Sequence, residues 1–210
     1  MKRLLIVYGT TDGHTAKIAR VLGNEFRRLG TVAHVAHAAT EDPDPAAYDG
    51  TVVAASVVMG HFQRPIRRWV RAHRSALAAR PNAFLSVCLG ILQEQGEVHQ
   101  DLALIANRFF TRTGWTPRRV EFVAGALPYT RYGWLKRWGM LRVVRKARGD
   151  TDTTRDHEYT DWNRVRVFAR GMVAGLKCAA ARKPEEPEAR LPGGADPAEV
   201  NVAERMTVPS

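Results

Sequence analysis

The sequence has only two cysteines, Cys88 and Cys178, in 210 residues. A small secreted domain that depends on disulfides carries many more, so we expect a reducing compartment and no disulfide framework. The chain also lacks a run of about 18 apolar residues, which a membrane-spanning helix would need. The apolar run after the N-terminal Met-Lys-Arg is too short for the core of a signal peptide. We therefore expect a cytoplasmic protein.

Two common nucleotide-binding motifs are absent as well. No G-x-x-x-x-G-K-[ST] sequence occurs, which excludes a Walker-type loop, and no G-x-G-x-x-G sequence occurs, which argues against a dinucleotide loop. Internal repeats are also absent, and we predict no metal site. A nucleotide or phosphate ligand would therefore need a different kind of loop.

The composition that is present favours a globular protein with an anionic partner. An apolar content of 45% is enough for a hydrophobic core, and the formal net charge is +11. A basic balance of this size favours nucleic acid, an anionic membrane surface or an acidic substrate. Arginine-rich surfaces in a basic proteome would give the same charge without any partner, so charge alone does not decide.

The most informative stretch is residues 9–15, with the sequence GTTDGHT. It follows a short apolar run at 4–8, typical of a buried strand, and precedes apolar residues at helical spacing from Ile18 to Leu29. The N-terminus of a helix offers unpaired N–H groups and a positive dipole end, so this turn could hold a phosphate monoester without a metal. The alternative is a plain turn in which threonine and aspartate cap the helix. The candidate binding residues are Thr10, Thr11, Asp12, Gly13, His14 and Thr15.

Strand and helix patterns alternate along residues 1–177. Five short strands alternating with helices favour an α/β protein with a doubly wound parallel sheet. Gly30 and Gly114 stand where helices should end, and Thr160 and Asp161 stand where the last helix should begin. Beyond the first strand, the predicted strands are 31–36, 51–58, 82–89 and 119–127. Beyond the first helix, the apolar positions of the predicted helices run from Ile66 to Leu77, from Val98 to Phe109 and from Trp162 to Leu176.

The hydroxyl-rich turn ending in Gly-His-Thr resembles the phosphate loop of flavodoxins, which wraps the phosphate of FMN. The resemblance implies a five-stranded parallel sheet in the order 2-1-3-4-5, with the ligand beyond the carboxyl ends of the strands. That topology brings the loop 10–15 together with the loops 56–62 and 86–95, which would flank the flat ring. The free Cys88 we interpret as a buried strand thiol, and His61 could equally be a polar loop residue. The candidate residues of the two flanking loops are Ser56, Met59, Gly60, His61, Phe62, Leu89, Gly90, Ile91 and Leu92.

A long insertion, residues 128–160, separates the fifth strand from the last helix. Within it, residues 131–148 hold seven Lys or Arg and no acid, interleaved with Trp, Leu and Val. This pattern suits a segment on an anionic membrane surface, or a cradle for an apolar ligand that carries carboxylates. The alternative is a loop that packs back on its own domain. The candidate substrate-binding residues are Tyr129, Arg131, Tyr132 and Trp134.

The last residues, 178–210, differ in composition from the rest. They hold five of the eleven prolines and six acidic against four basic residues. Such a segment buries too little apolar surface to fold by itself. We predict a disordered tail that follows a single domain of residues 1–177.

Together with residues 60–62, 124–127 and 159–162, these features resemble the flavodoxin-like, quinone-dependent protoporphyrinogen IX dehydrogenases of bacteria. The resemblance covers roughly residues 1–177. It implies an FMN enzyme of heme biosynthesis, peripheral on the inner face of the cytoplasmic membrane. Such an enzyme takes six electrons from protoporphyrinogen IX and passes them to menaquinone or ubiquinone. No catalytic acid or base is assigned, although His61 and Tyr132 are candidates for moving protons.

Two other functions are compatible with the sequence. One is an FMN protein that shuttles single electrons to a protein partner. The other is a domain that has lost its flavin and binds nucleic acid or a membrane, because basic residues among aromatics also suit single-stranded nucleic acid. The bases are concentrated in one insertion and no nucleic-acid motif occurs, so we expect no nucleic-acid partner.

Overall fold

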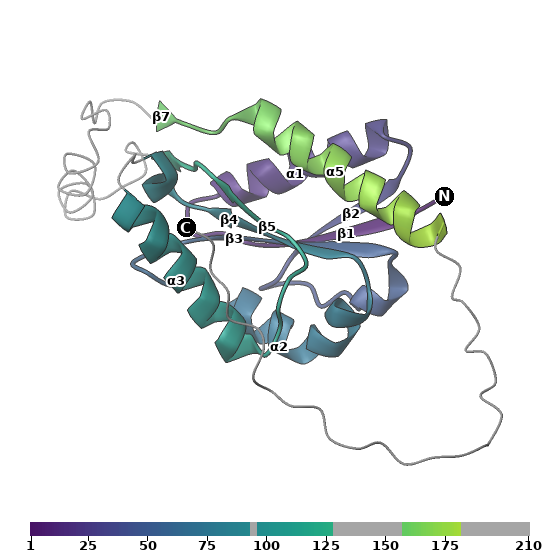
Figure 1. Cartoon of the computed structure of the whole chain (residues 1–210), viewed down its shortest axis with the longest axis horizontal. Coiled ribbons are helices and arrows are strands. Elements are labelled where there is room, and N and C mark those ends of the chain that lie inside the picture. Colours follow the sequence, from purple (N-terminus) through teal and green to yellow (C-terminus); the bar gives the residue numbers. More distant parts are fainter. Residues whose placement is uncertain (93–95, 128–156, 182–210) are drawn as a thin grey trace, which may run out of the picture.

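The computed structural model of the protein describes residues 1–92, 96–127 and 157–181 (Figure 1). Five parallel strands form one sheet in the order β2-β1-β3-β4-β5, which confirms the predicted topology. β2 is added on one side of β1, and β3 and the later strands are added on the other side. In sheets of this kind the ligand-binding crevice lies where the order reverses, beyond the carboxyl ends of β1 and β3. The strands are β1 Arg3–Gly9, β2 Val32–His37, β3 Gly50–Ser56, β4 Asn82–Val87 and β5 Val120–Val123.

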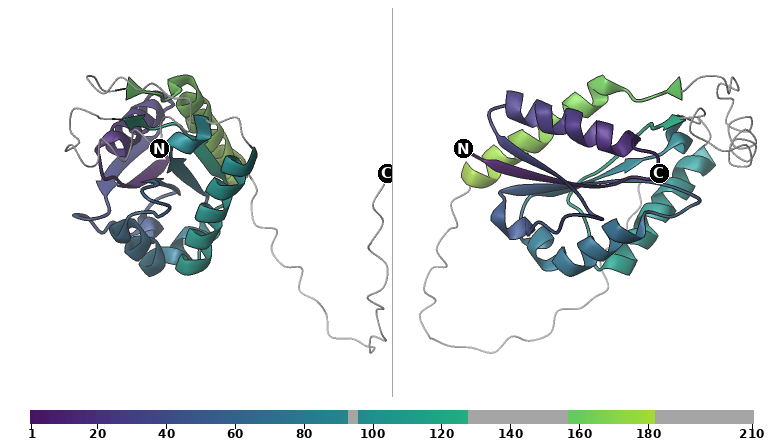
Figure 2. Two further views of the ribbon diagram at one scale, coloured as in Figure 1. Left: turned by 90° about the vertical axis from the view of Figure 1, so that its left-hand side faces the viewer. Right: turned by 180° about the vertical axis from the view of Figure 1, so that it is seen from behind.

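Helices cover both faces of the sheet (Figures 1 and 2). One layer holds α1 (His14–Arg28) and α5 (Trp162–Ala181), and the other holds α2 (Arg64–Ala79) and α3 (Gly96–Thr113). Alternate residues of β1 pack against the two helix layers, because successive side chains of a strand point to opposite faces of the sheet. Two short 3-10 helices, η1 (Pro45–Ala47) and η2 (Leu89–Leu92), lie in loops.

The central strands are buried on both faces, as their apolar runs predicted. Leu4 and Ile6 pack with the residues of α1 and α5, whereas Leu5 and Val7 pack with those of α2 and α3. All four are fully buried. Continuous apolar strands of this kind are typical of parallel sheets covered on both sides.

Two predicted helix ends are confirmed. Gly30 has φ 80° and Gly114 has φ 66°, the left-handed conformation that glycine adopts without strain. The Gly30 N–H donates to the Arg27 carbonyl at 3.0 Å, and the Thr31 N–H donates to the Phe26 carbonyl at 3.1 Å. These bonds end α1 and turn the chain into β2.

The predicted fifth strand, 119–127, is divided in two. β5 ends at Val123, and β6 (Ala126–Leu127) pairs antiparallel with β7 (His157–Glu158) in a separate two-stranded sheet. The Tyr159 N–H donates to the Gly125 carbonyl at 3.1 Å, next to this pair. The end of the predicted insertion is thereby fixed beside β5.

The predicted domain boundary, insertion and tail can be compared with the structure only in part. α5 continues to Ala181, so the predicted domain boundary at 177 falls within this helix. Most of the predicted insertion, 128–156, and the predicted tail from 182 onward lie outside the described residues. No helix in the described ranges has both the length and the apolar content to cross a bilayer.

Gly50 allows the sheet, α5 and the segment before β4 to meet closely. An added Cβ would lie 2.9 Å from Cδ2 of Leu176 and 3.1 Å from the Pro81 carbonyl oxygen. That carbonyl accepts the Thr51 N–H at 3.0 Å and cannot easily move. We expect Gly50→Ala to lower the free energy of unfolding by about 1–3 kcal/mol, through overpacking, as measured by urea denaturation.

Gly175 provides the matched control for that substitution. It lies in α5, and no atom lies within 4 Å of the position that its Cβ would take. Gly175→Ala should raise the free energy of unfolding by about 0.5–1 kcal/mol, since alanine is the better helix former. Equal effects at the two positions would contradict the close packing at Gly50.

Candidate functional site

The turn between β1 and α1 leaves the N-terminus of α1 without a side-chain cap. Gly13 is the N-cap residue, with φ 88°, and its N–H donates to Thr10 Oγ1 at 2.9 Å. The first turn of the helix contains no acidic residue. The first N–H groups of a helix have no partner within the helix, so the positive end of this helix is open to an anion. Gly13 rather than Asp12 occupies the N-cap position, and Asp12 lies half-buried in the turn.

Thr15 supplies the second observation at this turn. Its side chain is only 1% exposed, and its Oγ1 has no hydrogen-bond partner among the described residues. Leaving a buried hydroxyl unpaired costs about 1–3 kcal/mol. A phosphate oxygen at the start of α1 would accept this hydroxyl, so the site fits the phosphate end of a nucleotide.

Gln63, which the sequence analysis did not select, joins the first loop to the second. Its Nε2 donates to Ser56 Oγ at 2.6 Å and to Thr11 Oγ1 at 3.1 Å, while its Oε1 is buried without a partner in the described chain. An added Cβ at Gly9 would lie 3.1 Å from that Oε1. Gly9 therefore gives Gln63 the room to hold Thr11 and Ser56 in place.

The loop after β3 closes as a two-residue turn. Met59 has φ 49° and Gly60 has φ 76°, and Val58 pairs with His61 across them. Positive φ at both central residues is the mark of a tight hairpin turn. Met59 is 94% exposed at its tip, and His61 is also exposed. This turn presents an apolar and a polar side chain at the carboxyl end of β3.

Phe62 corrects one expectation for this loop. Its ring is 7% exposed and packs against Phe84 and Phe109, with centroid distances of 5.1 and 5.0 Å. The ring is therefore part of the core, and only its edge faces solvent. Met59 and His61 are the exposed side chains of the loop, and the buried Phe62 ring holds the loop against the core.

The third loop begins at η2 (Leu89–Leu92), and residues 93–95 lie outside the described ranges. An added Cβ at Gly90 would lie 3.3 Å from Cγ1 of Val98 and 3.4 Å from Cδ1 of Leu102, so this backbone packs on α3. Leu89, Gly90 and Ile91 are half-buried, and Leu92 is exposed. The position after β4 agrees with a loop that borders a ligand through its backbone.

Cys88 is a buried thiol, as predicted. Burial raises its pKa to about 11, although the Ile91 backbone opposes this. We expect Cys88 in a Cys178→Ser variant to react with iodoacetamide about 100-fold more slowly at pH 8 than an exposed cysteine, because the thiolate is the reactive form. Mass spectrometry of the alkylated peptides measures the rate. Fast labelling of the folded protein would contradict the buried thiol, and labelling in denaturant provides the control.

His14 and Thr160 connect the start of α1 to the segment before α5. His14 Nε2 lies 2.6 Å from Thr160 Oγ1, and that hydroxyl donates to the Ala124 carbonyl at 2.8 Å. Since the hydroxyl has one proton to donate, His14 Nε2 is the donor in the first bond. Burial lowers the pKa of His14, opposed by Glu158, which favours the neutral ring. His14 therefore holds Thr160 rather than pointing at the phosphate site.

Lys17 and Glu158 add a second link between the same two segments. Lys17 Nζ lies 2.5 Å from Glu158 Oε2 and 5.2 Å from the centre of the Trp162 ring. Burial raises the pKa of Glu158, but hydrogen bonds from Lys17 and Trp162 outweigh it and lower the pKa overall. The segment that follows the insertion is thus attached to α1, whose N-terminus is the candidate phosphate site.

The capping of α5 differs in part from the prediction. Asp161 accepts the N–H groups of Asn163 and Arg164 at 2.9 and 3.1 Å, so it is a cap. Thr160 makes the bonds to His14 and Ala124 instead. Thr160→Val should lower the free energy of unfolding by about 1–3 kcal/mol, because the Ala124 carbonyl and His14 lose their partner.

Chemical denaturation measures the effect of Thr160→Val. Thr116→Val, at an exposed threonine, is the control and should change the free energy of unfolding by no more than about 0.5 kcal/mol. Equal, small effects of the two substitutions would show that the His14–Thr160 link contributes no stability.

The other predicted positions are placed as follows. Tyr129, Arg131, Tyr132 and Trp134, predicted to bind substrate, lie outside the described residues. Within the described ranges, no group of three or more His, Cys, Asp or Glu could hold a metal ion. The residues that the fold brings together are therefore those of the first two loops, with the backbone of the third.

Comparisons with known proteins agree with this geometry. The flavodoxin domain family matches residues 5–154. A short-chain flavodoxin associated with a non-canonical PDU bacterial microcompartment has the same fold, with a TM-score of 0.53 and 16% identity over 84% of this chain and 99% of that one.

Two relatives are much more similar in sequence. The protoporphyrinogen IX dehydrogenase [quinone] of Escherichia coli (strain K12) is 36% identical over 172 residues, which cover 81% of this chain and 94% of the relative. The protein of the same name from Leishmania major is 32% identical over 199 residues, covering 91% of this chain and 83% of the relative. The phosphate-type turn, the sheet order and these matches show that the chain belongs to the flavodoxin-like protoporphyrinogen IX dehydrogenase family.

Proposed function

We propose that the protein binds FMN and oxidises protoporphyrinogen IX to protoporphyrin IX, with a membrane quinone as acceptor, in heme biosynthesis. The observation that carries the proposal is the unpaired, buried hydroxyl of Thr15 beside the uncapped start of α1. This phosphate site stands in a chain that matches 94% of the length of a relative named for that reaction. FMN, when bound, supplies the redox chemistry, and the protein supplies binding and orientation.

The donors and surfaces at the site fit the parts of FMN. Thr15 and the first N–H groups of α1 would hold the phosphate, with Thr10 and Thr11 beside them. Met59 and His61 would lie near the flat ring, and the backbone of Leu89–Leu92 would border its edge. Gln63 would act indirectly, since it fixes Thr11 and Ser56.

The substrate and membrane parts of the proposal depend on the insertion. Tyr129, Arg131, Tyr132 and Trp134 would contact the porphyrinogen. The seven basic residues of 131–148, interleaved with apolar ones, would hold the protein on the anionic inner face of the cytoplasmic membrane, where the quinone resides. The attachment of residues 157–160 to α1 supports this arrangement, because it keeps one end of the insertion beside the phosphate site.

The test is an anaerobic assay of the FMN-loaded protein with protoporphyrinogen IX and either a menaquinone or a ubiquinone analogue. We expect porphyrin fluorescence to rise only when protein and quinone are both present. Deletion of 130–155 should abolish this activity. Porphyrin formation no faster than in a sample without protein would refute the proposal.

The same assay addresses the alternative, an FMN protein that passes electrons to a protein partner. That function predicts an activity that needs no quinone and survives deletion of 130–155. The names of the relatives favour the quinone-dependent enzyme over this alternative.

A further inference from the structure

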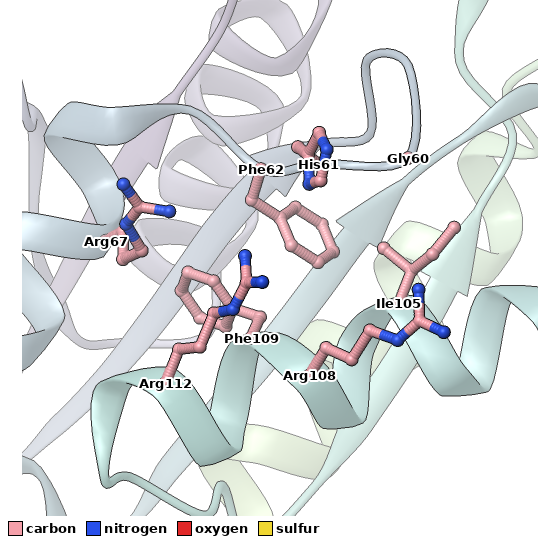
Figure 3. A pocket seen from close by; sticks show the side chains of 8 residues that line it. All are labelled: Gly60, His61, Phe62, Arg67, Ile105, Arg108, Phe109 and Arg112. Atoms are coloured by element: carbon pink, nitrogen blue, oxygen red, sulfur yellow. The ribbon is translucent and has the colours of Figure 1, made fainter.

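A small pocket lies beside the loop of Met59 and His61. Figure 3 shows the residues that line the pocket between that loop and α3. The pocket has a volume of about 140 Å³. Phe62, Ile105 and Phe109 form its apolar lining, and Arg67, Arg108 and Arg112 surround it. Sites that enclose a whole drug-sized ligand measure about 300–1,000 Å³, so this pocket suits an arm of a larger ligand.

The three arginines have no counter-charge in the described chain. None of their guanidinium groups forms an ion pair or a hydrogen bond with another described residue. By contrast, Arg119, which precedes β5, and Arg164 of α5 both pair with Glu121. Three cations around one cavity repel one another, and an anion in the cavity would remove that repulsion.

The chemistry of the pocket selects a carboxylate attached to an apolar body. Arginine binds carboxylates through two parallel N–H bonds, and the edge-to-face pair of Phe62 and Phe109 gives the pocket an apolar wall. Its rim includes Gly60 and His61, which belong to the turn that we place beside the flavin ring. A ligand with its acidic arms in the pocket would have its body next to that ring.

We propose that Arg67, Arg108 and Arg112 bind the propionate groups of the porphyrinogen substrate. This inference rests on the proposed function. It adds a carboxylate subsite that is formed by residues of α2 and α3 and not by residues of the insertion. The macrocycle stays outside the pocket, toward Met59 and His61, and only the carboxylate arms enter.

A neighbouring hollow provides a matched control. It has a volume of about 420 Å³ and lies along α2. Its lining includes Arg64, Arg68 and Arg71 of α2, together with Ala38 and Ala39. It shares Arg67 with the first pocket but has no aromatic lining residue. Replacing its three other arginines removes the same charge without touching the proposed subsite.

The binding test uses the stable product, protoporphyrin IX, and its dimethyl ester, titrated in detergent into the FMN-loaded protein. The variant R67Q/R108Q/R112Q should bind protoporphyrin IX roughly 100-fold more weakly. This change corresponds to about 2.7 kcal/mol for the three arginines together, which is within the range for one or two hydrogen bonds to a charged group. Its affinity for the dimethyl ester should equal that of the wild type. The variant R64Q/R68Q/R71Q should stay within about threefold of the wild type for both ligands.

Kinetics give an independent readout of the same subsite. In the porphyrinogen assay, R67Q/R108Q/R112Q should raise KM and leave kcat unchanged, because the arginines bind the ground state and the transition state equally. A wild type that does not turn over porphyrinogen would refute the proposed function. An active wild type with unchanged KM and protoporphyrin affinity in the variant would overturn the subsite alone.

A lipid headgroup is the other anion that such arginines could meet. Sedimentation with phosphatidylglycerol vesicles separates the two ligands. We expect both triple variants to bind vesicles alike, since each loses three charges from one basic surface. Loss of vesicle binding in R67Q/R108Q/R112Q alone, with protoporphyrin affinity intact, would overturn the proposal and identify a headgroup site.

Discussion

Replacing Thr15 by valine should weaken FMN binding about 10- to 100-fold and leave riboflavin binding unchanged. The Thr15 hydroxyl is buried without a partner in the described chain, and a hydrogen bond to a charged phosphate contributes about 1.5–3 kcal/mol. Valine keeps the shape of threonine and removes only the hydroxyl. Riboflavin lacks the phosphate, so it reports any damage to the ring site.

The same substitution should stabilise the apoprotein. Without FMN the hydroxyl is an unsatisfied polar group, and its removal relieves a cost of about 1–3 kcal/mol. Fluorescence titration of the apoprotein with each flavin measures affinity, and urea denaturation measures stability. A loss of affinity that is equal for FMN and riboflavin would contradict the assignment of Thr15 to the phosphate.

Replacing Phe62 by alanine should strongly destabilise the protein. Truncation of a buried phenylalanine costs about 3–5 kcal/mol, which corresponds to a Tm lower by roughly 6–20 °C for a chain of this size. The Phe62 ring packs on Phe84 and Phe109 directly below the turn of Met59 and His61. Loosening this turn should weaken FMN binding by about tenfold, because the site is then no longer preorganised.

Phe168→Ala is the control that distinguishes the loss of stability from the loss of FMN affinity. Phe168 is fully buried in the other core, between the sheet and α5. Its truncation should lower Tm by a similar amount and leave FMN affinity within about threefold at a temperature where the protein is folded. Differential scanning calorimetry and flavin titration check both. Equal losses of FMN affinity in the two variants would show that Phe62 has no specific link to the turn.

Local patterns in the sequence were sufficient for the main elements of the fold. The apolar runs of β1, β3 and β4 are buried on both faces, and Gly30 and Gly114 take the left-handed conformation that ends a helix. The order of the strands followed from the phosphate-type turn and the family resemblance. These features depend on residues close together in the chain, where periodicity and turn chemistry are informative.

Contacts between distant residues could not be predicted in the same way. Gln63 bonds to Thr11 across 52 positions, and Thr160 bonds to His14 across 146. Strands of two residues, such as β6 and β7, are too short to show any periodicity.

The arginine pocket was also beyond the sequence analysis. Arg67 belongs to α2, whereas Arg108 and Arg112 belong to α3, and each pattern alone indicates an ordinary solvent-facing position. Only the packing of the two helices on the same face of the sheet brings the three guanidinium groups around one cavity. The aromatic residues Phe62 and Phe109 were recognised as apolar, but their contact depends on the same packing.

Anaerobic mixing of the FMN-loaded protein with protoporphyrinogen IX tests the central claim most directly. We predict that the yellow colour of the protein bleaches on mixing, that protoporphyrin fluorescence appears, and that a quinone then restores the colour. A protein that stays yellow in excess porphyrinogen, or that bleaches but is not recoloured by any quinone, would contradict the account.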